Sequence, residues 1–212
     1  MSPEYKFNAY IVTATVSVMY VVVTKLIPQA SSFSWIPNGL ITIASTVGTY
    51  HVFSKALGYL ARKSNRIKKH FLGASFLQGT WAGSFTDNGE KIITIEHFEQ
   101  SLSGLKIRGQ AFSPDGTTYA QWRSTAASVS SADGTLTYTY ESDSYSDNPH
   151  SFKGIGFFQF DRESEYHAPI TIHGYSADLN GQAAERFENR ETKIDDALLK
   201  MEVALEAAKK MV

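Results

Sequence analysis

The hydrophobic pattern of the chain changes after about seventy residues, and the first part predicts membrane helices. Residues 7–24 and 31–54 are apolar runs, each without an Asp, Glu, Lys or Arg. A helix of about 20 such residues spans the roughly 30 Å hydrocarbon core of a bilayer. Pro28, which lies between the runs, should end the first helix. The pattern therefore predicts a two-helix transmembrane hairpin over residues 1–54.

Two other interpretations of these runs stay open. A cleaved signal peptide would have a basic N-terminal segment and a shorter apolar core. Here the N-terminus has only Lys6 near Glu4, and a second apolar run follows. The other alternative is a hairpin buried inside a soluble protein, because Thr, Ser and Asn dilute both runs.

A basic connector, 55–76, follows the second run. Residues 55–70 contain six Lys and Arg and no acid. The positive-inside rule places such a segment in the cytoplasm, and two crossings then place the N-terminus there as well. Anionic lipid headgroups would attract the connector by about 1 kcal/mol per basic residue. A solvated linker is the alternative.

From Gly79 onward apolar and polar positions alternate, which is typical of β-strands. The turns between the alternating segments are short, and their Asn-Gly and Asp-Gly pairs suit tight hairpins. Connections this short leave no room for crossover helices, so the sheet must be antiparallel. The sequence predicts a closed antiparallel β-barrel of about eight strands over residues 77–191. The strands are expected at 79–86, 91–98, 103–112, 117–128, 135–142, 151–160 and 169–177, with a weaker eighth near 185–191.

Glycines inside these strands are the second feature of the barrel region. Glycine in a strand marks a bend or a close approach of backbone, as at the corners of a barrel. A barrel of about eight strands either fills itself with side chains or holds one small ligand. The interrupting glycines are Gly83, Gly104, Gly109, Gly154, Gly156 and Gly174.

The last segment, 192–212, is predicted to form a C-terminal helix. Thr192 would cap it, and Lys209 and Lys210 would lie in its last turn. The helix is expected either to pack on the side of the barrel or to associate with a second copy through a seam of apolar residues. The seam would consist of Ile194, Leu198, Met201, Leu205, Ala208 and Val212.

Charge and composition narrow the possible functions. Residues 71–212 contain twelve Lys and Arg against twenty Asp and Glu, so this part repels long nucleic acid. The chain has no cysteine, which excludes disulfides and a catalytic thiol. It also lacks a zinc-protease motif, a dinucleotide fingerprint and a nucleophile elbow. We therefore expect a binding protein rather than an enzyme, with no metal and no cofactor.

Basic and aromatic residues on the strands are the candidates for ligand binding. Aromatic rings stack on nucleobases, and Arg or Lys binds phosphate. The alternation places Tyr119 and Arg123 on one strand face and Trp122 on the other. Aromatic residues that simply fill the barrel, and cations that point to water, are the alternative. The candidates are Arg108, Tyr119, Trp122, Arg123, Tyr138, Tyr140, Lys153 and Tyr175.

The order of these parts resembles a known family. Two N-terminal membrane helices, a basic connector and a barrel that opens with Leu77, Gly79, Thr80, Trp81 and Gly83 are similar to the two-transmembrane β-barrel effectors of bacterial CBASS anti-phage systems. The segment ITIHGYSAD, 170–178, is similar to a late barrel strand of that family. The resemblance covers roughly residues 1–190, and the C-terminal helix has no clear counterpart.

The resemblance implies a mechanism. A nucleotidyltransferase would make a cyclic oligonucleotide, typically a cyclic dinucleotide, and the barrel would bind it. The protein would then form a homo-oligomer and disrupt the lipid of the bacterial inner membrane, so that the infected cell dies. The main alternative is a membrane-tethered, calycin-like barrel that binds an apolar small molecule or lipid, since the Gly-x-Trp opening suits both. A ligand-free interaction module is a third interpretation.

Overall fold

The computed structural model describes residues 3–26, 38–145, 150–180 and 183–211. The chain divides into two compact units, Met1–Phe71 and Leu72–Val212. The predicted connector is therefore divided as well. Its residues up to Phe71 belong to the first unit, and its last residues, from Leu72 onward, belong to the second.

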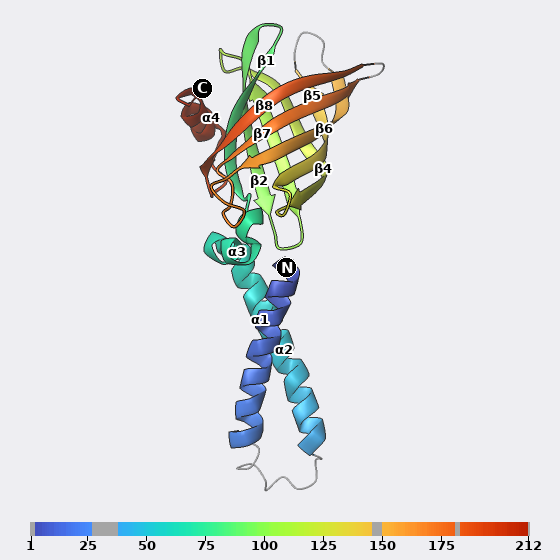
Figure 1. Cartoon of the computed structure of the whole chain (residues 1–212), viewed down its shortest axis with the longest axis vertical. Helices are drawn as coiled ribbons and strands as arrows, with labels where there is room; N and C mark the ends of the chain where they lie inside the picture. The colour runs from blue at the N-terminus through green and yellow to red at the C-terminus, as the bar shows by residue number, and fades with distance from the viewer. Residues whose placement is uncertain (1–2, 27–37, 146–149, 181–182, 212) are drawn as a thin grey trace. The chain divides into compact units, whose positions relative to one another are not determined.

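The first unit is helical. Helix α1 (Pro3–Val21) continues into the π-helical turn η1 (Val22–Leu26), and α2 (Asn38–Lys63) is followed by α3 (Asn65–Leu72). Figure 1 shows α1 and α2 side by side, as a helical hairpin. The expected helix end at Pro28 and the first residues of the second apolar run lie outside the described residues.

One face of α1 packs inside the unit and the rest is exposed. Ile11, Thr15 and Met19 are buried, and their spacing of four residues places them on one side of the helix. The hydroxyl of Thr49 on α2 lies 4.0 Å from the sulfur of Met19. An apolar surface of this extent is typical of a helix that meets lipid or a partner. The exposed apolar side chains of α1 include Tyr5, Tyr10, Val12, Val16, Val18, Tyr20 and Val21.

Across the described ranges, one helix is long and apolar enough to cross a membrane. It runs from Pro3 to Lys25, with a mean hydropathy of 1.6. This agrees with the first predicted crossing by length and composition. Helix α2 has 26 residues and ends in Arg62 and Lys63. The second crossing and the orientation stay predictions.

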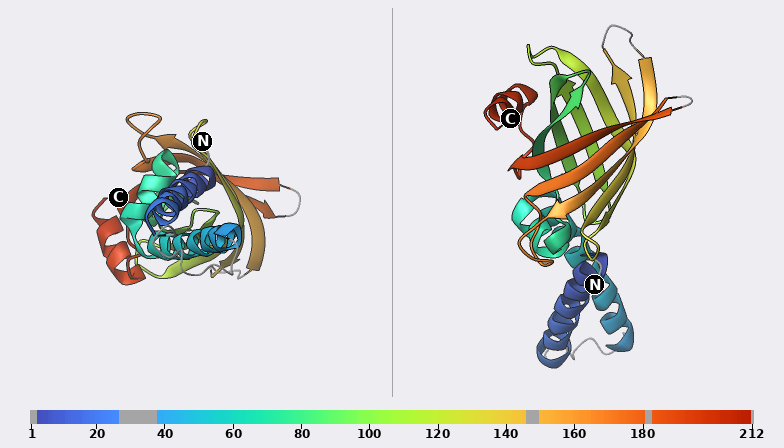
Figure 2. Two further views of the ribbon diagram at one scale, coloured as in Figure 1. Left: turned by 90° about the horizontal axis from the view of Figure 1, so that it is seen from below. Right: turned by 45° about the horizontal axis from the view of Figure 1, so that its top comes forward.

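The second unit is a closed, antiparallel, eight-stranded β-barrel, which confirms the predicted fold class. Each strand pairs with the next along the chain, and β8 pairs with β1 to close the barrel (Figures 1 and 2). The weakly predicted eighth strand is present and is longer than expected. The strands are β1 (Gly79–Asp87), β2 (Glu90–Gln100), β3 (Leu105–Phe112), β4 (Thr118–Ser130), β5 (Thr135–Ser144), β6 (His150–Asp161), β7 (Thr171–Asn180) and β8 (Ala183–Asp195).

The closing seam between β1 and β8 is short. Its pairing runs from Thr80 opposite Asp195 to Ser84 opposite Arg190, whereas β8 pairs with β7 from Ala183 to Thr192. Beyond that seam, the rings of Phe85 and Phe187 are 5.0 Å apart. Side-chain packing therefore takes the place of backbone pairing in this part of the wall.

One end of the barrel is filled by a core. The indole of Trp81 donates a hydrogen bond to the carbonyl of Leu77 at 2.9 Å and stacks on Phe98, with ring centroids 5.3 Å apart. The ammonium of Lys193, whose side chain is almost buried, lies 5.1 Å from the centroid of the Trp81 ring. Gln100 accepts the backbone N–H of Leu77 at 2.7 Å. The Gly-Thr-Trp segment of the sequence therefore builds this closed end.

The predicted start of the C-terminal helix at Thr192 is wrong. Strand β8 continues to Asp195, and α4 begins only at Met201 and ends at Lys209. Thr192 is paired with Thr171 on β7 and with Ala82 on β1, and these ladder bonds outweigh its capping potential. Ile194, a β-branched residue, favours the same extended conformation.

Helix α4 packs on the outside of the barrel wall. Ala204 and Ala208 are fully buried against a patch of the first three strands. This confirms the side-packing interpretation. The three-heptad seam does not form, because Ile194 lies on a strand rather than on the helix. The barrel residues of the patch are Ala82, Ile93, Ile95 and Phe112.

Candidate functional site

Three aromatic side chains lie flat against glycines of a neighbouring strand. Trp122 is directly opposite Gly109, Tyr138 is opposite Gly156, and Tyr140 is opposite Gly154. A Cβ atom at any of the three glycines would lie closer to the ring opposite than van der Waals contact allows. The expected close approach of backbone is found at Gly83 and Gly174, where carbonyl oxygens are the nearest atoms, whereas at these three glycines a ring makes the closest approach.

These rings direct their polar atoms to carboxylates inside the barrel. Glu96 on β2 accepts the indole N–H of Trp122 at 2.7 Å and the hydroxyl of Tyr138 at 3.0 Å. Tyr140 donates its hydroxyl to Asp178 on β7. Burial and the neighbouring carboxylates raise the pKa of both tyrosines, so their hydroxyls stay protonated donors.

Glu96 forms a buried pair with Glu191 on β8. Their exposed fractions are 1% and 0%. Burial raises the pKa of both carboxyls, and the neighbouring Glu96 raises that of Glu191 further. A protonated Glu191 therefore donates to Glu96, while Asn189 donates its amide to Glu191 at 3.0 Å. Gly83 leaves room for this pair, because a Cβ there would collide with the side chain of Glu191.

The open part of the barrel interior is a small acidic cavity of about 130 Å³, which we call the inner cavity. Asp87, Glu96 and Asp178 line it, and the described lining contains no lysine or arginine. Tyr119 donates its hydroxyl to Asp87. Its aromatic lining is Phe85, Tyr119, Trp122, Tyr138, Tyr140, Phe152 and Phe187.

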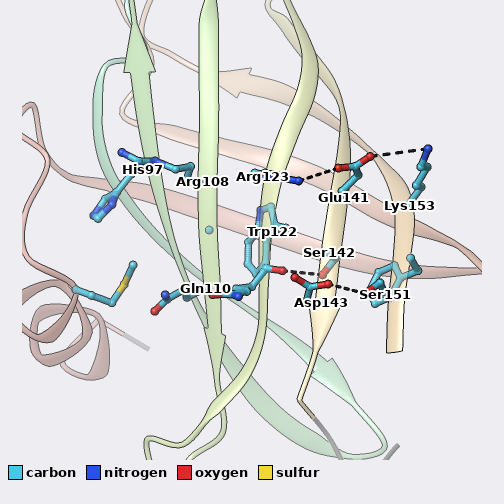
Figure 3. Close-up of a pocket in the computed structure, with 14 residues that line it drawn as sticks. His97, Arg108, Gln110, Trp122, Arg123, Glu141, Ser142, Asp143, Ser151 and Lys153 are labelled. Atoms are coloured by element: carbon cyan, nitrogen blue, oxygen red, sulfur yellow. Dashed lines mark hydrogen bonds and ion pairs between the residues drawn. The ribbon is translucent and has the colours of Figure 1, made fainter. Parts of the chain in front are cut away.

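A larger recess of about 710 Å³ lies on the outer face of strands β2–β6, and we call it the outer recess. Figure 3 shows Arg108, Arg123, Glu141 and Lys153 in one row across adjacent strands. Arg108 is directly opposite Arg123, which is opposite Glu141, which is opposite Lys153. Strand alternation produces this row, because each residue points outward from its own strand.

Carboxylates partly neutralise the row. Glu141 lies 3.3 Å from the guanidinium of Arg123 and 3.8 Å from the ammonium of Lys153. Arg108 pairs with Glu99. The side chains of Arg108 and Arg123 are 65% and 76% exposed, so both can also reach a ligand.

His97 borders the row on β2, directly opposite Arg108. Burial lowers the pKa of its imidazole, and the Arg108 charge lowers it further. The ring is therefore neutral at pH 7. A neutral imidazole adds no charge to the recess, and this ring also hydrogen-bonds the backbone of Leu199.

The eight predicted binding residues separate into three places. Arg108, Arg123 and Lys153 line the outer recess, and Tyr119, Tyr138 and Tyr140 line the inner cavity. Trp122 borders both, with its indole directed to Glu96 inside. Tyr175 lies apart from them, 6.0 Å from Phe157 by ring centroids, with the Arg186 guanidinium 3.9 Å from its ring. Tyr119 does not share the face of Arg123, because the β3–β4 register shifts beside it.

The interior carboxylates were not among the predicted residues. Glu96 and Asp178 occupy inward positions of their strands, two residues from Phe98 and Ser176 respectively. The available signal was that Glu96 shares a strand face with the apolar residues Ile92 and Phe98. Comparisons with protein-family models, with curated proteins and with solved structures give no match for this chain.

Proposed function

We propose that this protein is a membrane-anchored receptor that binds a cyclic oligonucleotide, specifically a cyclic dinucleotide, in the outer recess of its barrel. Binding then promotes assembly and disruption of the bacterial inner membrane. The opposed pair Arg108 and Arg123 carries the proposal. Like charges directly opposite on a sheet destabilise it by up to about 1 kcal/mol. An anionic ligand would offset that cost.

The size of the recess also supports this ligand class. Pockets for small ligands occupy about 300–1,000 Å³, and the outer recess measures about 710 Å³. A cyclic dinucleotide carries two phosphates, which match two guanidinium groups on adjacent strands. Gln110 and Gln121 lie opposite each other, two residues along their strands from Arg108 and Arg123, and supply amide groups for base edges.

The other features of the proposal come from the helical unit and from the family resemblance. Helix α1 is apolar and exposed on most of its surface. We propose α2 as the second crossing and the basic residues after it as cytoplasmic, by the positive-inside rule. The similarity to CBASS effectors through Leu77, Gly79, Thr80, Trp81 and Gly83 supplies the ligand class and the killing mechanism.

The calycin-like alternative receives less support from the geometry. The inner cavity measures about 130 Å³, which is below the usual range for a lipid or a similar apolar molecule. Its carboxylates would also lose hydration on contact with an apolar ligand, which is unfavourable. The outer recess therefore remains the better candidate site.

Calorimetric titration of the full chain in nanodiscs with a panel of cyclic di- and trinucleotides tests the proposal. Arg108→Ala and Arg123→Ala should each weaken binding by at least about tenfold, because a charge-assisted hydrogen bond contributes about 1.5–3 kcal/mol. Arg190→Ala is the matched control. Arg190 is also exposed and ion-paired, at 3.1 Å from Asp161, but lies outside the recess.

A second variant should act in the opposite direction. Glu141→Gln removes a carboxylate that competes for Arg123 and Lys153. Because an exposed ion pair contributes about 0.2–1 kcal/mol, binding should tighten by up to about fivefold. The proposal is wrong if no member of the panel binds the folded chain. It is also wrong if Arg190→Ala weakens binding as much as Arg123→Ala.

A further inference from the structure

The inner cavity has the opposite charge pattern to the outer recess. Asp87, Glu96 and Asp178 place carboxyl groups on it from strands β1, β2 and β7. The lining residues that the structure describes include no lysine or arginine to balance them. The field inside the cavity is therefore negative, and an anionic ligand would be repelled.

Two buried oxygens of this cavity have no hydrogen-bond partner. They are the hydroxyl oxygen of Thr94 and the amide oxygen of Asn189. Thr94 is 1% exposed, and both residues line the cavity. Buried acceptors of this kind need a donor, which points to a ligand rich in N–H groups.

Aromatic rings form the remaining wall. Trp122, Tyr138 and Tyr140 lie flat on the strand glycines opposite them, and Phe152 also lines the cavity. The π-faces of such rings attract ammonium and guanidinium groups, more strongly where water is excluded. Carboxylates combined with aromatic walls are complementary to an organic cation.

We propose that the inner cavity binds a small organic cation with N–H donors, such as a guanidinium or primary ammonium group. The volume of about 130 Å³ holds roughly four water volumes of about 30 Å³ each, so a group of about five heavy atoms fits. Glu96 and Asp178 pair with its charge, and Thr94 and Asn189 accept its remaining N–H groups. This site lies inside the barrel and shares Trp122, Ser142 and Phe152 with the outer recess, but its ligand has the opposite charge to the nucleotide.

An organic cation suits the cavity better than a metal ion. In the described residues, no group of three or more His, Asp and Glu side chains is placed to hold a metal. Glu96 already accepts two hydrogen bonds, from Trp122 and Tyr138, through one of its oxygens. A planar guanidinium can approach the carboxylates and the two unpaired oxygens together, because its N–H groups diverge in one plane.

Saturation-transfer NMR on the full chain in deuterated nanodiscs tests this site with two probes of nearly equal shape. Methylguanidinium is the cationic probe and methylurea is its neutral counterpart, and the methyl protons of both report binding. We expect transfer to methylguanidinium and little to methylurea. Glu96→Gln should weaken methylguanidinium binding at least about tenfold, the loss expected for a charge-assisted hydrogen bond.

Two further variants keep the test decisive. Asp178→Asn removes a carboxylate from another strand of the cavity and should also weaken methylguanidinium binding. This variant tests the proposal if Glu96→Gln does not fold. Asp161→Asn removes an exposed carboxylate that lines neither pocket and should leave the transfer unchanged. Equal transfer to methylurea, no transfer in the unmodified chain, or full transfer in Asp178→Asn would each overturn the proposal.

Discussion

Glu96 and Glu191 place two carboxyl groups in the barrel interior with almost no exposed surface. Both have a raised pKa, chiefly because burial disfavours the charged form. Such a carboxyl binds its proton more tightly in the folded chain than in the unfolded one. The pair therefore makes the free energy of unfolding depend on pH.

The direction of this dependence follows from linkage. The favourable contribution is fully present below the unfolded carboxyl pKa of about 4.3 and is lost as the pH rises toward the raised folded value. Glu191→Gln keeps a donor for Glu96 without an ionisable group. We expect the melting temperature of this variant at pH 8 to be a few degrees higher than that of the unmodified chain. A change of about 1 kcal/mol in the free energy of unfolding shifts the melting temperature of a chain of this size by roughly 2–4 °C. At pH 5 the difference in melting temperature should be smaller. An equal difference at both pH values would contradict the raised pKa of the buried carboxyl pair.

Strand alternation in the sequence was sufficient to place Arg123 and Trp122 on opposite faces of their strand, but only the structure shows that Trp122 is the one directed inside. It could not place Tyr119, because a register shift between neighbouring strands is set by the partner strand and not by the local pattern. Nor could it predict the pairing of Glu96 with Glu191, which lie on β2 and β8. Only the closure of the barrel brings them together.

At the scale of the strands, the glycine positions determine where the aromatic rings lie. Gly109, Gly154 and Gly156 remove the side chains that would otherwise hold the opposite rings away from the wall. The rings therefore lie flat, and the inner cavity stays open. The glycines could be read from the sequence, but the ring opposite each one depends on the register, which the sequence did not define.

Gly109→Ala tests this arrangement. The added methyl group would collide with the Trp122 indole and displace it from Glu96. We expect a loss of stability of about 1–3 kcal/mol, the usual cost of overpacking. Denaturant unfolding of the full chain measures it. Gly104→Ala is the control, because nothing lies within 4 Å of a Cβ at that position, and an equal loss in both variants would rule out the ring contact as the cause.

The C-terminal segment shows that a local hydrophobic pattern does not by itself decide between helix and strand. Asp195, Asp196 and the apolar spacing around them are compatible with a helix, yet β8 continues to Asp195. Pairing with two neighbouring strands decides the conformation there. Only from Met201 onward, where strand pairing has ended, does the helical pattern predict the structure correctly.

At the scale of the whole molecule, the chain has a helical unit and a barrel unit. The change of hydrophobic period near Gly79 predicted this division, because membrane-type runs and alternating strands have different spacings. The proposed function assigns membrane disruption to the first unit and ligand binding to the second.

Expression of the second unit alone tests that division. A fragment of residues 72–212 should be found in the soluble fraction and should not kill cells, because it lacks α1 and α2. It should still bind the cyclic oligonucleotide with an affinity within about threefold of the full chain, since the recess lies on strands β2–β6. Toxicity of this fragment at equal expression would contradict the assignment.

The short seam between β1 and β8 has a consequence for kinetics. Backbone pairing there ends at Ser84 and Arg190, and the rings of Phe85 and Phe187 continue the contact beside the inner cavity. Side-chain rotations are faster than the local unfolding of a paired strand. A small molecule can therefore enter and leave the cavity at a rate set by two rings, while the hydrogen-bonded remainder of the barrel stays closed.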